Sequence, residues 1–205
     1  MIDQKIKDFL IEKEPKLKPL IDAVTLPALT STDVYFSLIE SIVSQQLSVK
    51  AADTIHQRFL GLFPSKYPHP EYVAAVDLEQ MRAIGLSYQK ANYIKNTADH
   101  FVKNDLLDKD WSAMSDDEII ASLTSIKGVG KWTVQMILMF TLQRTDVLPV
   151  DDLGIQQGFE KLFDLDKENL KLMKKQMETI AESWRPYRSI ACRYIWRYKD
   201  TVGKN

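Results

Sequence analysis

Hydrophobic residues recur at helical spacing along most of this chain, and no series of alternating polar and apolar positions indicates strands. One stripe near the N-terminus consists of Ile2, Ile6, Phe9 and Leu10. Similar stripes predict a helix that Asp33 or Ser31 caps, and then helices near residues 49–63 (capped by Ser48), 78–84, 88–103, 115–123, 131–142, 152–163, 167–184 and 187–199. The prolines within 64–70 predict a loop. The pattern therefore predicts an all-α fold.

Composition and charge exclude several classes of protein. The 205 residues carry 27 Lys and Arg against 28 Asp and Glu, so any contact with a polyanion must be local. A single cysteine, Cys192, and three scattered histidines exclude a four-cysteine iron–sulfur cluster and a zinc ribbon. The N-terminus does not resemble a signal peptide, and the longest apolar run, 134–142, is too short to span a bilayer. We expect one cytoplasmic domain over 1–205, without membrane contact.

The segment 123–136 reads LTSIKGVGKWTVQM, the end of one helix, a Gly-Val-Gly turn and the start of another helix. Gly128 and Gly130 permit a close approach of the backbone to another molecule, and the first N–H groups of the second helix can bind an anion. Lys127 and Lys131 add local positive charge. The segment favours a phosphate-binding hairpin, although an ordinary turn with Gly128 as a helix C-cap explains the glycines equally well.

Two acidic residues follow about twenty positions later, at the predicted start of a helix. Adjacent helical residues point about 100° apart, so Asp151 and Asp152 cannot flank one bond as a conventional pair of glycosidase carboxylates does. One can cap the helix or support its neighbour, while the other stabilises a developing cation. The alternative is that both are capping acids.

Together these residues resemble the helix-hairpin-helix superfamily of DNA glycosylases, most closely its 3-methyladenine DNA glycosylase II branch. The resemblance rests on IVSQQLS at 42–48, IKGVGKWT at 126–133, LPVDD at 148–152, WRPYRS at 184–189 and YIW at 194–196. It covers roughly residues 32–200, in the order and approximate spacing of the family. It departs from the longer bacterial members because only about thirty residues precede the helical core.

The resemblance implies two helical lobes with a cleft between them. Lobe A would cover about 32–145, with the hairpin at 117–142, and lobe B would combine about 1–31 with 146–205. Asp152 would be the catalytic acid and Asp151 its structural support. Bifunctional relatives place a nucleophilic lysine where this chain has Trp132, so the resemblance implies hydrolysis of the glycosidic bond without strand cleavage.

The resemblance also implies roles for other residues. The expected pocket residues around a flipped base are Trp132, Trp196, Tyr187, Met136 and Leu153, with core packing as the alternative for each. The expected DNA contacts are Gln46, Leu47, Ser48, Lys127, Gly128, Gly130, Lys131, Thr133 and Arg188, with Arg193, Arg197 and Lys199 as further candidates. Main-chain carbonyls of Thr124, Ile126 and Val129 would hold a monovalent cation, and no other cofactor is expected.

The predicted function is a monofunctional glycosylase that removes alkylated purines of the 3-methyladenine and 7-methylguanine type from duplex DNA. Such bases carry a positive charge, leave readily and are attracted to aromatic faces. The expected partner is duplex DNA with a damaged base, and the enzyme is expected to act as a monomer at the nucleoid. Two alternatives are the same fold acting on deaminated or oxidised bases, and a non-catalytic DNA-binding module.

Overall fold

The computed structural model describes the backbone of residues 2–202 and the side chains of residues 2–197. Every regular element within these bounds is a helix, which confirms the predicted all-α fold. The chain divides into two compact units. Unit 1 combines 1–30 with 143–205, and unit 2 is Ser31–Leu142. The sequence placed the corresponding boundaries at 32 and 145.

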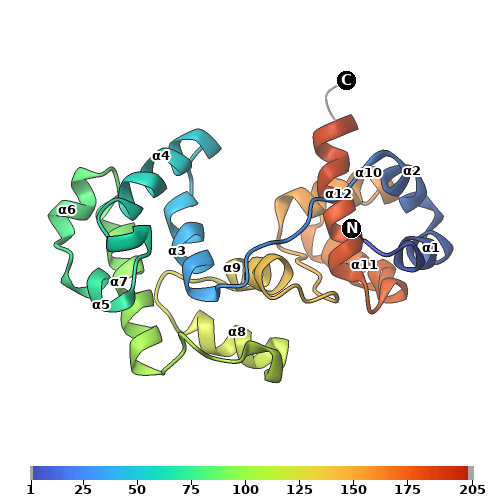
Figure 1. Ribbon diagram of the computed structural model, residues 1–205. Helices are drawn as coiled ribbons and strands as arrows, with labels where there is room; N and C mark the ends of the chain where they lie inside the picture. Colours follow the sequence, from blue (N-terminus) through green and yellow to red (C-terminus); the bar gives the residue numbers. More distant parts are fainter. Residues whose placement is uncertain (1, 203–205) are drawn as a thin grey trace. The chain divides into compact units, whose positions relative to one another are not determined.

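Unit 2 is built around the long helix α7, which packs against α3, α5 and α6 (Figure 1). Its helices are α3 (Val34–Ser44), α4 (Val49–Leu60), α5 (Pro70–Ala75), α6 (Leu78–Ala83), α7 (Tyr88–Lys103), α8 (Asp116–Thr124) and α9 (Lys131–Met136), with short 3-10 turns at Pro64–Lys66 and Trp111–Ala113. Fully buried Leu38, Ile94 and Phe101 lie in its core. The predicted helix over 131–142 instead changes to a π-helical turn at Ile137–Thr141.

Unit 1 joins the two ends of the chain. It contains α1 (Gln4–Lys13), a 3-10 turn (Pro15–Leu17), α2 (Lys18–Ala23), α10 (Leu153–Phe163), α11 (Leu170–Ala181), a second 3-10 turn (Glu182–Trp184) and α12 (Arg188–Val202). Helix α12 packs against both α10 and α2, so the first helices complete a core that the C-terminal helices begin. Fully buried Leu10, Phe159 and Trp184 lie in this core.

Short polar side chains begin several of the helices, as the sequence predicts. Asp33 rather than Ser31 caps α3, because its Oδ1 accepts a hydrogen bond from the N–H of Phe36 at 2.8 Å. Ser48 caps α4 in the same way through Ala51 N–H, at 3.3 Å. Such caps satisfy N–H groups that have no partner inside the helix.

A second element also differs from the prediction. The prolines between 64 and 70 favoured a loop, but Pro70 begins α5 as its first residue. Proline suits that position because its fixed φ is helical and its missing N–H would have no partner inside the helix. Across the described residues, no helix is both long enough and apolar enough to cross a bilayer.

Candidate active site

The glycine turn between α8 and α9 is a tight hairpin that α7 supports from within unit 2. Gly128 has φ +105°, which residues with a side chain rarely adopt, and a Cβ there would lie 2.2 Å from the ring of Tyr93. Asn96 on the same helix donates from Nδ2 to the carbonyl of Lys127 at 3.4 Å. Gly128 is therefore required both by its φ and by the ring that packs on it.

The second glycine of the hairpin faces open space. Gly130 is the N-cap of α9, and a Cβ added there would meet no atom of the described residues within 4 Å, so another molecule can approach its backbone closely. Lys127 and Lys131 on either side are exposed. The Thr133 side chain in the first turn of α9 is only 4 % exposed, so its predicted contact with DNA would have to come from its backbone N–H.

The carbonyl groups predicted to hold a cation lie in the same turn. The carbonyl of Ile126 accepts a hydrogen bond from the N–H of Val129 at 3.0 Å, which closes the turn. The side chains of Ile126 and Val129 are buried, at 3 % and 5 % exposure, and this anchors the turn from which the carbonyls project. Each carbonyl oxygen has two lone pairs, so the Ile126 oxygen keeps acceptor capacity, and oxygen donors of this kind suit a hard cation.

A short turn, which we call the wedge turn, joins α3 to α4 at residues 45–48. Gln46 adopts φ +57° and is exposed, and Leu47 is 38 % exposed. Ser48 is exposed at the cap of α4. Lys90 on α7 donates from Nζ to the carbonyl of Val43 at 2.8 Å, near the C-terminal end of α3. The wedge turn thus presents Gln46 and Leu47 outward from a supported helix end.

Trp132 lies beside the wedge turn. It is 43 % exposed in the first turn of α9 and lines a pocket of about 340 Å³ with Ser41, Ser44, Gln45 and Gln46. The sequence predicted Trp132 as a pocket residue and Gln46 as a DNA contact, but it did not show that the two line the same pocket of unit 2. Met136, one turn later on α9, is half-buried.

In unit 1, Asp152 is both a helix cap and the acceptor of a tryptophan N–H. Its Oδ1 accepts from the N–H of Ile155 at 2.8 Å and from Nε1 of Trp196 at 2.7 Å. The carboxyl group is half-buried at the start of α10. Two donors on one oxygen fix the plane and direction of a carboxylate.

Two glycines allow α12 to approach α10 closely enough for this contact. A Cβ on Gly154 would lie 2.8 Å from Cδ1 of Trp196 and 3.1 Å from Oδ1 of Asp152. A Cβ on Gly158, one turn further along, would lie 2.1 Å from Cγ2 of Ile195. Only glycine at both positions leaves room for the indole to reach the carboxylate, and the sequence motifs indicated no role for either.

The neighbouring acid, Asp151, lies in a different environment. Asp151 is exposed and its Oδ1 forms an ion pair with Nζ of Lys174 on α11 at 2.6 Å. The two adjacent carboxyl groups therefore contact different helices, as expected for neighbouring positions at a helix start. The pairing of Asp151 with α11 is consistent with the supporting role that the resemblance implied.

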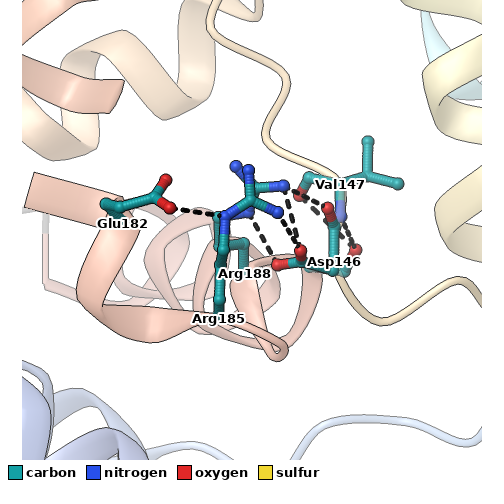
Figure 2. Close-up of polar contacts among 6 residues, drawn as sticks. Asp146, Val147, Glu182, Arg185 and Arg188 are labelled. Atoms are coloured by element: carbon teal, nitrogen blue, oxygen red, sulfur yellow. Dashed lines mark hydrogen bonds and ion pairs between the residues drawn. The ribbon is translucent and has the colours of Figure 1, made fainter. Parts of the chain in front are cut away.

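The segment that leads to Asp152 is fixed to the start of α12. Arg188 donates from Nε to Oδ1 of Asp146 at 2.7 Å and from Nη2 to the Asp146 carbonyl at 2.7 Å (Figure 2). Arg185 also pairs with Asp146, and with Glu182 at 2.9 Å. Ser189 is buried and accepts from the N–H of Val147 at 2.8 Å. We call this set the α12 clasp: Asp146, Val147, Arg188 and Ser189.

The clasp changes the interpretation of Arg188. Its side chain is 15 % exposed and its charge is compensated by Asp146, so the structure favours a supporting role over the predicted phosphate contact. Sequence reasoning missed Asp146 because it lies 42 residues before Arg188. The only signal was the WRPYRS motif itself, which contains Arg185, Arg188 and Ser189 without indicating their partner.

Other predicted residues of unit 1 lie in varied surroundings. Tyr187 packs edge-on against Phe9 of α1 with ring centroids 5.4 Å apart, which favours its alternative role in the core. Leu153 is 65 % exposed at the first residue of α10.

The further candidates for DNA contact also differ from one another. Arg193 is buried and donates to the carbonyl of Pro27 at 2.6 Å, so it is a structural residue. Arg197 is exposed, and the Lys199 side chain lies outside the described residues.

Cys192 lies on α12 between the clasp and Trp196. It is fully buried, and burial raises the pKa of its thiol well above the usual range. A thiol with a raised pKa holds its proton and is a poor nucleophile. Cys192 is therefore not a candidate nucleophile.

Comparison with known proteins decides the family. The family model described as "HhH-GPD superfamily base excision DNA repair protein" matches residues 39–186, which include the wedge turn, the hairpin and Asp152. The chain belongs to this superfamily. The match confirms the helix-hairpin-helix family predicted from the sequence motifs.

Several relatives that match along most of the chain carry names of the predicted branch. DNA-3-methyladenine glycosylase 1 of Schizosaccharomyces pombe is 39% identical over 166 residues, 80% of this chain and 71% of the relative. The putative DNA-3-methyladenine glycosylase YfjP of Bacillus subtilis is 33% identical over 177 residues, 83% of this chain and 61% of the relative. The chain thus spans less than two thirds of the second of these relatives.

Several solved structures match this chain over nearly its full length, and two of them are more than 30% identical to it. A DNA-3-methyladenine glycosidase from Bacillus halodurans has a TM-score of 0.86 and 31% identity, covering 99% of this chain and 93% of that one. The 3-methyladenine DNA glycosylase of Schizosaccharomyces pombe in complex with abasic DNA has a TM-score of 0.84 and 32% identity, covering 98% and 100%. These comparisons confirm the predicted 3-methyladenine glycosylase branch.

Proposed function

We propose that this chain is a DNA glycosylase of base excision repair that hydrolyses the bond between deoxyribose and an alkylated purine. The observation that carries the proposal is the carboxyl group of Asp152, whose Oδ1 accepts from Ile155 N–H and Trp196 Nε1 at 2.8 and 2.7 Å. The relatives named as DNA-3-methyladenine glycosylases at 39% and 33% identity support the same activity.

The reaction needs a fixed negative charge more than an acid catalyst. A purine alkylated at N3 or N7 carries a positive charge and departs as a neutral base when the bond from its ring nitrogen to C1′ breaks. The electron pair of that bond leaves with the base, so the positive charge passes to the sugar. Asp152 stabilises this oxocarbenium-like sugar, water adds to C1′, and the carboxylate accepts the proton that the water loses.

We also propose that the enzyme does not cleave the DNA strand. Trp132 stands at the position where the resemblance places the lysine nucleophile of bifunctional relatives, and an indole cannot form a Schiff base. Lys131 is exposed one residue earlier and points in a different direction from the helix. The product is therefore an intact strand with an abasic site.

Unit 2 supplies contacts to DNA. The exposed backbone at Gly130 and the ammonium groups of Lys127 and Lys131 bind backbone phosphates, and the wedge turn fills the space left by an extruded nucleotide. Gln46 is the plug, with Leu47 and Ser48 beside it. The aromatic ring of Trp132 in this unit is a candidate for contact with the cationic base, and Trp196 of unit 1 is a second candidate.

The hairpin also offers a site for a monovalent cation, held by the main-chain carbonyls of Thr124, Ile126 and Val129. Its oxygen donors and closed turn fit such an ion, which would bring positive charge to the phosphate-binding hairpin. The catalytic step requires no other cofactor. We further propose that the enzyme acts as a monomer on DNA in the cytoplasm.

The first prediction tests the chemistry directly. Duplex DNA carrying a methylated purine is incubated with wild type and with Asp152→Asn, and both the free base and strand breaks are measured. We expect base release by wild type without nicking, and a loss of about a hundredfold or more in Asp152→Asn, because an amide keeps the shape but removes the charge. Binding to abasic duplex should be largely retained.

The arms of this experiment separate the alternatives. Unchanged base release by Asp152→Asn would refute the role of the carboxylate, and nicking that follows base release would refute hydrolysis without lyase chemistry. Parallel duplexes with deaminated or oxidised bases test the other substrate classes. DNA binding without release of any base would instead identify a non-catalytic binding module.

A further inference from the structure

Acidic residues are missing from three stretches of unit 2. The whole chain has 28 Asp and Glu among 205 residues, but residues 41–52, 80–98 and 119–142 contain none. The first stretch includes the wedge turn and the third includes the hairpin, which are the two DNA contacts of the proposed function. The second stretch, 80–98, supports both of them from α7 but makes no DNA contact in that function. It shares with them the absence of negative charges that would repel phosphates.

The second stretch supplies the first half of α7, where a groove runs along the helix. The groove has a volume of about 470 Å³ and is lined by Tyr88, Gln89, Asn92, Tyr93, Asn96 and Lys127. Residues three and four positions apart share one face of a helix, so the five α7 residues form one strip. The lining thus contains one lysine, three side-chain amides and two tyrosines, with no carboxyl group.

The groove is continuous with the glycine hairpin. Lys127 belongs to both, and Asn96 donates to the carbonyl of Lys127 at 3.4 Å. The ring of Tyr93 fills the space that a side chain on Gly128 would need. A DNA strand that follows the hairpin within unit 2 therefore meets α7 next.

The groups in the groove match a sugar–phosphate backbone. The amide nitrogens of Gln89 and Asn92 each make one internal hydrogen bond, to the Tyr93 hydroxyl and the Tyr88 carbonyl, and each has a second N–H to donate. The groove also lies at the N-terminal end of a sixteen-residue helix, where the helix dipole favours an anion. Tyr88, 59 % exposed, offers a flat surface for a deoxyribose.

We propose that the groove along the first half of α7 binds the DNA backbone next to the segment held by the hairpin. This inference rests on the proposed function and extends its DNA contacts. Donors that reach phosphate and sugar oxygens carry no information about base sequence, so the groove strengthens binding to damaged and undamaged duplex alike. Its contribution falls as salt rises, because the contact releases counterions.

The second prediction uses a pair of substitutions that should not destabilise the fold. Tyr88→Glu with Gln89→Glu adds two negative charges in the first turn of α7, where acidic residues stabilise a helix. Made in the Asp152→Asn protein, the pair should weaken binding to abasic and to undamaged duplex by about tenfold at low salt. Fluorescence anisotropy over a series of salt concentrations measures both the affinity and its salt dependence.

The matched control is Val102→Glu with Lys103→Gln, which makes the same change in net charge at exposed positions near the other end of α7. We expect this control to bind almost as the parent does. A second arm shortens the duplex on one flank at a time, and the deficit of the groove variant should shrink when the flank that it contacts is removed.

The outcomes distinguish this inference from the proposed function. Equal affinity of the groove variant and the parent, or an equal loss in the control, overturns the groove as a DNA contact even if wild type releases base. Absence of base release by wild type overturns the proposed activity, whereas a selective loss of DNA binding in the groove variant would still support the groove.

Discussion

Asp152 illustrates how one carboxyl group is given a fixed direction. As the cap of α10 it accepts from Ile155 N–H, and as the partner of α12 it accepts from Trp196 Nε1 through the same oxygen, Oδ1. A carboxylate held in this way does not need to reorient when positive charge develops on a sugar. The sequence predicted Trp196 as a pocket aromatic, and the structure adds a hydrogen bond from its N–H to the carboxyl group, which suits a positioning role.

The third prediction tests this positioning through Trp196→Phe. An aromatic ring remains but the N–H donor is lost, so the carboxylate loses one of the contacts that orient it, and a hydrogen bond to a charged group contributes about 1.5–3 kcal/mol. We expect kcat for base release to fall by about tenfold or more, with a smaller change in KM. Single-turnover kinetics with methylated duplex separate the two parameters.

Trp184→Phe is the control for removing an indole from unit 1. Trp184 is fully buried against Phe159 and Phe163, and its Nε1 has no hydrogen-bond partner among the described residues. Its replacement should lower the free energy of unfolding without a selective effect on kcat. If Trp196→Phe behaved in the same way, its indole would be a packing residue and the positioning role would be refuted.

Individual residues differ in how far the sequence could identify them. The family motif and the helix start pointed to Asp152, and the small polar caps Asp33 and Ser48 follow from local chemistry alone. Arg188 was predicted as a phosphate contact because a sequence shows a cation without its partner. Asp146 lies 42 residues away, and only folding brings the two together.

At the scale of elements, α12 holds the segment before α10 at two places. The clasp fixes Asp146 and Val147 to the first residues of α12, and Trp196 holds Asp152 further along the same helix. The segment 146–152 is thus attached near both of its ends to one rigid helix. Glycine is needed at positions 154 and 158 because even a Cβ atom there would force α10 and α12 apart.

The fourth prediction is a double-mutant cycle on the clasp. Arg188→Gln, Asp146→Asn and the double variant are compared by chemical denaturation. The pair is mostly shielded from solvent and makes two contacts between side chains, so we expect a coupling of about 1–3 kcal/mol. Each single variant should also reduce base release, because the segment that carries Asp152 loses its attachment.

Arg185→Gln provides the comparison for the clasp. Arg185 also pairs with Asp146, but its side chain is 47 % exposed, and exposed ion pairs contribute about 0–1 kcal/mol. We expect a smaller loss of stability and little change in base release. A coupling near zero between Arg188 and Asp146 would show that Ser189 and the packing of α12 hold the segment without the ion pair.

Helical elements were predictable where their apolar stripes were long. The predicted 88–103 coincides with α7, and Ser48 marks the start of α4. Two elements differ for local reasons. Pro70 begins a helix instead of a loop, and the apolar run after Met136 takes a π-helical turn that hydrophobic periodicity cannot distinguish from an α-helix.

At the scale of the whole molecule, a net charge of −1 conceals an uneven distribution of acids. The hairpin, the wedge turn and the α7 groove all fall in acid-free stretches of unit 2, while unit 1 presents Asp152. A chain of nearly zero charge can therefore bind a polyanion through local surfaces. Composition alone predicted that such contact must be local but could not place it.

Unit 2 also contains one buried histidine, His56, and one half-buried histidine, His100, that link stability to pH. Burial lowers the pKa of His56, outweighing the opposing effects of Glu40 and Asp53, and burial lowers the pKa of His100. In both residues Nε2 is buried without a hydrogen-bond partner in the part of the chain that the structure describes. The folded state therefore prefers both rings neutral, while the unfolded chain takes up protons near the ordinary histidine pKa of about 6.5.

The fifth prediction follows from the sign of this difference. Because the folded pKa lies below the unfolded value, the contribution of these histidines is fully present above about pH 6.5 and is lost as the pH falls toward their folded pKa values. The free energy of unfolding should decrease from about pH 7.5 to about 5.5, and His56→Leu should reduce that decrease because it removes one titrating group. Urea denaturation at a series of pH values gives the slope.

His69→Leu is the matched control because His69 is exposed on the loop before α5. A proton bound by the unfolded state and not by the folded state changes the free energy of unfolding by at most about 1.4 kcal/mol per pH unit. Removal of one buried histidine can therefore reduce the pH slope by no more than this amount. A slope that fell equally in His56→Leu and His69→Leu would place the pH dependence elsewhere. A slope reduced only in His56→Leu would show that the core of unit 2 retains a buried neutral imidazole at the expense of stability in acid.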